Sequence, residues 1–205
     1  MKLILPEVYL ESDDEEIRVK AIHQNMRDYI ENGVLQELPA GFMLTKRSFG
    51  KEHARCGLVV EIDLETYEYK KGEHSLTRPT EMTVEERIPP RLRVRQQAVL
   101  ELPHIMLLID DPDFSVIEPL MERKDSFKQI YDTDLMLNGG HISGWLIPEG
   151  EETAAIMDKI EALAAPGAFR EKYGLKEEYP PLNFAVGDGN HSMATAKAAW
   201  EQIKE

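Results

Sequence analysis

Six consecutive residues near the C-terminus combine the side chains that phosphate chemistry uses, in the order Gly187-Asp188-Gly189-Asn190-His191-Ser192. A short apolar strand is predicted before them, at 183–186, and an amphipathic helix after them, at 193–204. A turn that enters a helix binds anions, because the first helical N–H groups lack partners and the helix dipole favours negative charge there. Gly187 and Gly189 would let the backbone approach a phosphate with no Cβ in the way. The pattern therefore predicts a phosphate-binding turn.

The polar residues of this turn have distinct expected roles. Asp188 would repel a phosphate, so we expect it to ligate magnesium or to act as a general base. His191 would donate to a phosphoryl oxygen or shuttle a proton, and Ser192 would cap the helix or contact phosphate. The alternative is structural: Asp188 or Asn190 caps the helix, and the glycines only form the turn.

A short basic run lies in the middle of the chain, at 87–95, and contains no acidic residue. It holds four arginines, and a fifth precedes it: Arg87, Arg91, Arg93 and Arg95, with Arg78 before them. Guanidinium groups hold phosphate through paired hydrogen bonds, so we expect Arg78, Arg87 and Arg91 to neutralise charge across the site. Because the last three arginines of the run alternate with apolar residues, they are predicted to form one exposed strand face. The alternative is a solvated face that pairs with surface carboxylates.

The overall composition argues against several classes of protein. The chain has 205 residues, with 24 Lys and Arg against 38 Asp and Glu, which gives a formal net charge of −14. A general nucleic-acid binder needs clustered basic residues, so we expect no nucleic acid as a partner. The single cysteine, Cys56, excludes an internal disulfide and a zinc site of several cysteines. No apolar run is long enough to span a membrane and no signal peptide is recognised, so the expected location is the cytoplasm.

The elements that must position these residues mix helices and strands without strict alternation. Further helices are predicted from a capping box at 12–15 to Gly33, and at 83–88, 116–123 and 151–164. Further strands are predicted at 42–49, 55–63, 104–110, 127–137 and 141–147, with hairpin turns at 50–53 and 138–140. Pro89 and Pro90 should end the helix at 83–88. The pattern favours an α+β fold with a mixed sheet and flanking helices.

The other histidines, at positions 23, 53, 74, 104 and 141, show no spacing typical of metal ligands. We expect each of them to be structural or exposed. His104 begins a predicted buried strand, so its expected role is a satisfied hydrogen bond.

The segment at 184–192, with Ala-Thr-Ala-Lys behind it at 194–197, resembles the D-G-(H/N)-H-(R/S) signature of the DUF1015 family of uncharacterised proteins. The similarity covers most of the chain and continues at 57–64, 67–69, 75–81, 86–91 and 102–111. Family members are often related to the ParB-like and sulfiredoxin-like group, which includes a free-serine kinase. The resemblance implies that group's nucleotide-binding strand–turn–helix near the C-terminus. Because family members are usually longer, it also implies that residues 1–205 form a single α+β domain, truncated at both ends.

The function implied by this resemblance is that of a nucleotide-binding protein. The leading activity is a magnesium-dependent phosphotransfer from ATP or ADP to a small metabolite, by analogy with the serine kinase. Asp188 would be the base or the Mg²⁺ ligand, and Asn190 would join Gly187 and Gly189 in the phosphate cradle. The alternative is a non-enzymatic, nucleotide-sensing regulator or a ParB-like partition module.

Two departures from related proteins bear on the chemistry. Asn190 stands where sulfiredoxins carry their reactive cysteine, which argues against cysteine-based repair of peroxiredoxins. Ser192 stands where many relatives have arginine, so one phosphate clamp is missing.

Overall fold

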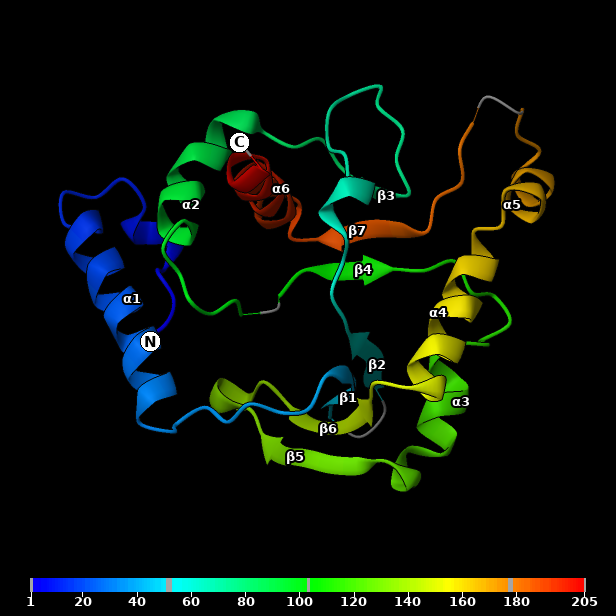
Figure 1. Cartoon of the computed structure of the whole chain (residues 1–205), viewed down its shortest axis with the longest axis horizontal. Helices are drawn as coiled ribbons and strands as arrows, with labels where there is room; N and C mark the ends of the chain where they lie inside the picture. Colours follow the sequence, from blue (N-terminus) through cyan, green and yellow to red (C-terminus); the bar gives the residue numbers. More distant parts are fainter. Residues whose placement is uncertain (1, 51–52, 103, 177–178, 205) are drawn as a thin grey trace. The chain divides into compact units, whose positions relative to one another are not determined.

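The computed structural model describes residues 2–50, 53–102, 104–176 and 179–204 (Figure 1). The chain divides into two compact units. The first consists of Met1–Glu37, Asp63–Leu108 and Phe184–Glu205, and the second of Leu38–Ile62 and Ile109–Asn183. The described residues form six α-helices and two β-sheets, and one of the sheets is mixed, so the predicted α+β class is confirmed. That residues 1–205 form a single domain stays a prediction.

The sheet of the first unit is mixed and has the strand order β3–β7–β4. The central strand is β7 (Phe184–Asp188), with β3 (Thr77–Pro79) parallel to it and β4 (Met106–Leu108) antiparallel. The helices of this unit are α1 (Glu15–Glu31), α2 (Ile88–Arg95) and α6 (Asn190–Lys204), and α2 packs beside α6 (Figure 1). Val186 of β7 and Ala194 of α6 have no exposed surface, so both the strand and the helix contribute to the core.

The sheet of the second unit is antiparallel and has the order β2–β1–β6–β5. Its strands are β1 (Gly41–Phe49), β2 (His53–Val59), β5 (Lys128–Asp134) and β6 (His141–Pro148). Its helices are α3 (Ile117–Glu122), α4 (Glu151–Leu163) and α5 (Pro166–Tyr173). Single turns of 3₁₀ helix complete the two units, at Glu7–Tyr9, Leu64–Thr66, Glu85–Arg87, Lys124–Ser126 and Met136–Asn138.

Several elements follow the sequence pattern closely. Helix α1 ends at Gly33 as predicted, and Gly33 has a left-handed φ of +65°. Its N–H donates to the Ile30 carbonyl at 3.1 Å and the Val34 N–H donates to the Tyr29 carbonyl at 2.9 Å, which is the bond pair of a Schellman motif. The pairings β1–β2 and β5–β6 confirm both predicted hairpins, and α3 and α4 confirm the helices predicted at 116–123 and 151–164.

Pro89 and Pro90 begin a helix instead of ending one. They stand in the first turn of α2, where the N–H that proline lacks would have no helical acceptor. The strand face predicted for Arg91, Arg93 and Arg95 is therefore wrong, because all three lie on this helix. The helix predicted at 83–88 is reduced to the 3₁₀ turn Glu85–Arg87, and Ile88 already belongs to α2.

Other boundaries also differ from the predicted ones. The buried strand predicted at 104–110 is only three residues long, and because β4 is an edge strand, Leu108 remains 49% exposed. Asp14 takes the N-cap position of α1, while the Ser12 hydroxyl contacts the Tyr9 carbonyl and the Asp14 carboxylate, so the predicted capping box does not form. Helix α5 was not predicted.

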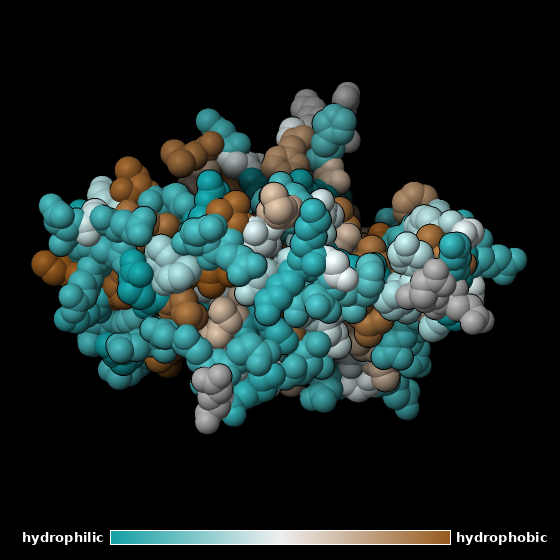
Figure 2. All heavy atoms as spheres, turned by 90° about the horizontal axis from the view of Figure 1, so that it is seen from above, coloured by the Kyte–Doolittle hydropathy of each residue, from teal (hydrophilic) through white to brown (hydrophobic). Residues whose placement is uncertain are grey.

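Polar side chains dominate the face of the molecule that Figure 2 shows. Figure 2 shows a mostly hydrophilic face with hydrophobic side chains scattered over it, as expected for a chain with 30% charged residues. In the described ranges, no helix combines the length and the apolar character that crossing a bilayer requires.

Gly144→Ala is expected to destabilise the second unit. The Tyr131 ring lies over Gly144 on the neighbouring strand, and a Cβ at Gly144 would lie 2.2 Å from Tyr131 Cζ. The ring must then move off the strand, and overpacking of this kind lowers the free energy of unfolding by about 1–3 kcal/mol. Urea unfolding measures the change. Gly57→Ala in the same sheet is the control, because its Cβ would meet nothing within 4 Å. Equal losses in both variants would contradict the packing argument.

Candidate functional site

A single residue joins β7 to α6. The strand extends to Asp188 and the helix begins at Asn190, so the predicted six-residue turn reduces to Gly189. The Gly189 carbonyl accepts a hydrogen bond from the Met193 N–H at 2.9 Å, which places Gly189 at the N-cap of α6. The backbone N–H groups of the next three residues have no acceptor within the helix, so this end of α6 can receive an anion.

Packing against β4 gives a sufficient reason for both glycines of the motif. Gly189 has a φ of +89°, and a Cβ there would lie 3.1 Å from Ile105 Cγ1 and 3.2 Å from Ile105 Cα. A Cβ at Gly187 would lie 2.9 Å from Leu108 Cδ1. β4 and the residue before it therefore fill the space on the Cβ side of both glycines, and the approach of this backbone to a phosphate stays a prediction.

Asp188 presents an exposed carboxylate beside the start of α6. Its Oδ1 accepts the Gly189 N–H at 2.8 Å, a bond to its own neighbour, while Gly189 itself takes the capping position. Within the described part of the chain, no three or more His, Cys, Asp or Glu side chains gather to hold a metal ion. A divalent cation at this place would therefore need Asp188 together with oxygens that are not carboxylate oxygens.

Asn190 supplies a buried side-chain amide oxygen. The residue is 3% exposed, and its Nδ2 makes a long contact of 3.5 Å to the Glu81 carbonyl. Its Oδ1 is buried and has no partner among the described residues. Leaving such an atom unpaired costs about 1–3 kcal/mol. An amide oxygen accepts from a hydroxyl or ligates Mg²⁺, whereas a phosphate oxygen, itself an acceptor, is no partner for it.

His191 is held in its neutral form. Its Nε2 accepts the Val84 N–H at 3.2 Å, so the hydrogen of the neutral ring lies on Nδ1. Burial lowers the pKa of His191 below its usual value of 6.5, and the nearby charges of Arg91 and Arg87 lower it further. The charges of Glu81 and Glu7 raise the pKa, so groups of both signs lie near the start of α6.

The four arginines at 87–95 have different partners. Arg87 and Arg91 lie one helical turn apart, and Arg91 donates to the Arg87 carbonyl at 2.8 Å and pairs with Glu7. The other two arginines are engaged elsewhere, in the ion pairs Arg93–Glu15 and Arg95–Glu101. The ion-paired face that the sequence offered as the alternative thus holds for Arg91, Arg93 and Arg95, and the phosphate clamp stays a prediction.

Arg78 occupies a different position from the arginines of α2. It lies on β3, where it pairs in register with Ala185 of β7, and its Nε donates to the Ser75 carbonyl at 2.8 Å. Burial lowers the pKa of the Arg78 guanidinium. It is thus placed alongside the strand that leads into the site.

The structure also adds a residue that the sequence left out of the site. His104 is exposed, and its Nε2 lies 2.8 Å from Ser192 Oγ in the first turn of α6. Its Nδ1 lies 2.8 Å from the Leu102 carbonyl. The expectation of a satisfied hydrogen bond for His104 is confirmed, but its partner is a residue of the predicted site. No spacing pattern could have found a contact across 88 residues.

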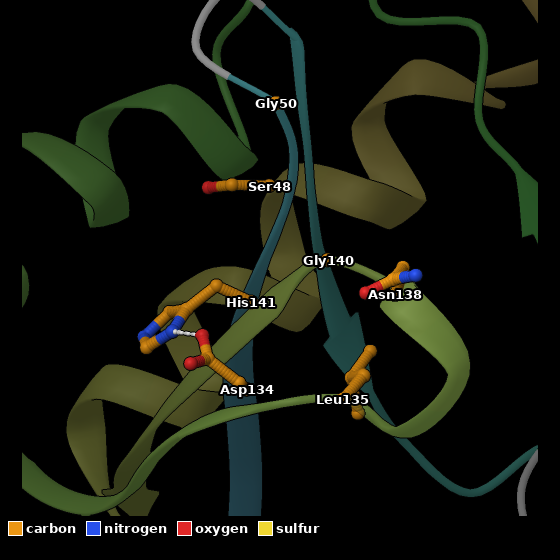
Figure 3. A pocket seen from close by; sticks show the side chains of 7 residues that line it. All are labelled: Ser48, Gly50, Asp134, Leu135, Asn138, Gly140 and His141. Carbon is orange, nitrogen blue, oxygen red and sulfur yellow. Dashed lines mark hydrogen bonds and ion pairs between the residues drawn. The ribbon is translucent and has the colours of Figure 1, made fainter.

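A separate hollow of about 340 Å³ lies at the end of the β5–β6 hairpin in the second unit, and no predicted site residue lines it (Figure 3). His141 of β6 faces Asp134 of β5 there, with Nδ1 2.8 Å from Asp134 Oδ1 (Figure 3). On its other side, His141 Nε2 lies 2.8 Å from Asp132 Oδ1. Hydrogen bonds to both carboxylates raise the pKa of His141. The charged groups of this hollow are thus already paired with one another.

Comparison with known proteins places the chain in a family without assigning an activity. Residues 1–205 match the DUF1015 family, described as proteins of unknown function, and the chain belongs to that family. No curated protein matches the chain. No solved structure matches it either.

His191→Gln is expected to flatten the pH dependence of stability. Because the folded-state pKa of His191 lies below its unfolded value near 6.5, the unfolded chain binds more protons as the solution is acidified. The neutral ring therefore contributes stability above that value, and the contribution is lost as the pH falls from about 7 to about 5. Urea unfolding across this range should show a smaller loss in the variant than in the wild type. His53→Gln serves as control, and an unchanged slope for His191→Gln would contradict the assignment.

Proposed function

We propose that this protein binds a nucleotide, ATP or ADP, together with Mg²⁺ where β7 enters α6. The observation that carries the proposal is the first turn of α6, which begins directly after Gly189 and whose N–H groups lack helical acceptors. The helix adds the positive end of its dipole. Arg87 and Arg91 lie close enough to act on His191 in this turn, beside the opposing charges of Glu81 and Glu7, and N–H donors with two arginines favour a phosphate ligand.

We assign each residue of the proposed site a role from the chemistry of its side chain or backbone. The first-turn N–H groups of α6, from Asn190 to Ser192, donate to phosphate oxygens, as does His191 Nδ1–H. Asp188 and Asn190 Oδ1 are oxygen donors that fit Mg²⁺, which is commonly bound through one or two carboxylates together with the phosphates themselves. Gly187 and Gly189 hold the junction close to β4. Arg87 and Arg91, with Arg78 behind them, neutralise the phosphate charge.

The activity that we favour is phosphoryl transfer to a small metabolite, like that of the free-serine kinase in the ParB-like group. When bound, the nucleotide and Mg²⁺ supply an activated phosphoryl group. Asp188 either ligates the metal or accepts the proton of the substrate hydroxyl. The ParB/sulfiredoxin-like character of the strand–turn–helix, a cytoplasmic location and the absence of a nucleic-acid partner belong to the same proposal.

The second candidate is a regulator or a ParB-like partition module that senses the nucleotide without turning it over. It is favoured by the composition of the site: Asp188 is the single carboxylate of the 187–192 segment, and its Oδ1 already accepts the Gly189 N–H.

Arg87→Ala is expected to weaken binding of Mg·ATP by about 10- to 150-fold, which corresponds to about 1.5–3 kcal/mol for a charge-assisted hydrogen bond. Titration calorimetry on the purified protein measures the affinity. Arg93→Ala is the control from the same basic run, because Arg93 is paired with Glu15. Equal affinity in wild type and Arg87→Ala, or an equal loss in Arg93→Ala, would rule out the proposed clamp.

Asp188→Asn is expected to fold normally and to lose magnesium-dependent turnover. Asn keeps the size of the side chain and an oxygen that can accept the Gly189 N–H, but it removes the charge needed for metal or base work. We expect a melting temperature close to that of the wild type and a loss of turnover of about 100-fold or more. Thermal unfolding and ATP turnover with MgCl₂ measure the two quantities. A wild type that binds ATP without turning it over would instead support the sensing role.

A further inference from the structure

Ser192 and His104 form a hydrogen bond, and a contact with the Leu102 carbonyl determines which of the two donates. The Leu102 carbonyl, 2.8 Å from His104 Nδ1, can only accept, so the hydrogen of the neutral ring lies on Nδ1. The lone pair is then on Nε2, and the Ser192 hydroxyl donates to it at 2.8 Å. The Leu102 carbonyl thus orients the His104 ring, and the ring accepts a hydrogen bond from the Ser192 hydroxyl.

This arrangement is that of a nucleophile with its general base. A hydroxyl is a weak nucleophile until a base within hydrogen-bond distance accepts its proton, and a third group usually orients that base. Here the three groups are Ser192 Oγ, His104 Nε2 and the Leu102 carbonyl. His191, on the same helical turn, is not available for this role because its Nε2 accepts the Val84 N–H.

The position of Ser192 favours a negatively charged phosphate group on its side-chain oxygen. Ser192 is the third residue of α6, so a phosphate on its oxygen would lie at the positive end of a helix of 15 residues. Asn190, in the same turn, has a buried Oδ1 without a partner among the described residues. Ser192 is half-buried and His104 is exposed, so a small molecule can reach the pair.

We propose that Ser192 is an activated nucleophile that accepts a phosphoryl group, with His104 as its general base. The donor is the nucleoside triphosphate of the proposed function, on which this part of the inference rests. Ser192 Oγ forms a bond to the terminal phosphorus while the bond from that phosphorus to the bridging oxygen breaks. The nucleoside diphosphate leaves with the electron pair, and the Ser192 proton passes to His104 Nε2. A substrate hydroxyl then forms a bond to this phosphorus and loses its proton to solvent, while the bond from phosphorus to Ser192 Oγ breaks. Ser192 Oγ leaves with the electron pair and recovers its proton from His104.

The first test needs no nucleotide and uses a fluorophosphonate reagent. Ser192 Oγ displaces fluoride from phosphorus, and the proton again passes to His104. We expect one adduct, assigned to Ser192 by peptide mass spectrometry on the wild-type protein, and none on Ser192→Ala. His104→Asn should react about 100-fold more slowly, the usual contribution of a general base. Ser75→Ala is a control for a serine whose hydroxyl contacts a carbonyl instead of a base, and His53→Asn is a control for an exposed histidine. No adduct at Ser192, or an equal rate for His104→Asn, overturns the activated nucleophile.

The second test incubates the protein with ATP and MgCl₂ and maps phosphoserine by mass spectrometry, while calorimetry follows ATP binding in parallel. Phosphate on Ser192, reduced about 100-fold in His104→Asn, is the expected result. If ATP binds and no phosphate appears on Ser192, the phosphoryl-acceptor role is overturned and the proposed nucleotide site stands. If the fluorophosphonate labels Ser192 and ATP does not bind, the proposed function and the phosphoryl transfer both fall, and only the activated serine remains.

Discussion

The close packing of β7 against β4 is the constraint on which the candidate site depends. Val186 has no exposed surface and lies in register with Pro79 of β3 and Leu107 of β4. Because Gly187 and Gly189 lack a Cβ, Leu108 and Ile105 can approach the end of the strand. That approach brings the preceding residue, His104, to the first turn of α6. Replacing either glycine would therefore disturb the sheet edge, the start of the helix and the Ser192–His104 contact together.

The second determinant of the site is the way in which α2 presents its arginines. Two prolines in its first turn make the basic segment helical, and helical spacing separates residues that a strand would have aligned. Arg87, which directly precedes α2, and Arg91 act on His191, while Arg91, Arg93 and Arg95 pair with Glu7, Glu15 and Glu101. The helical form of the segment thus decides which arginines lie near the N-terminus of α6.

The two units differ in whether they hold residues of the candidate site. All the residues proposed to act on a ligand belong to the first unit. The second unit has a regular antiparallel sheet, and β6, one of its two central strands, buries Trp145, Leu146 and Ile147. In the hollow at the end of its β5–β6 hairpin, the two charged lining residues His141 and Asp134 pair with each other (Figure 3).

The sequence by itself was sufficient for features that depend on local spacing: the α+β class, the two hairpins and the glycine that follows α1. It misjudged Pro89 and Pro90, because proline both ends helices and begins them, and only packing decides between the two. The phosphate-binding role of Gly187 and Gly189 stays a prediction, to which the structure adds that Leu108 and Ile105 pack where a Cβ would stand. The tertiary structure alone revealed the Ser192–His104 pair and the proximity of Arg87 and Arg91 to His191, because each joins segments far apart in the chain, and no periodicity or local spacing records such a contact.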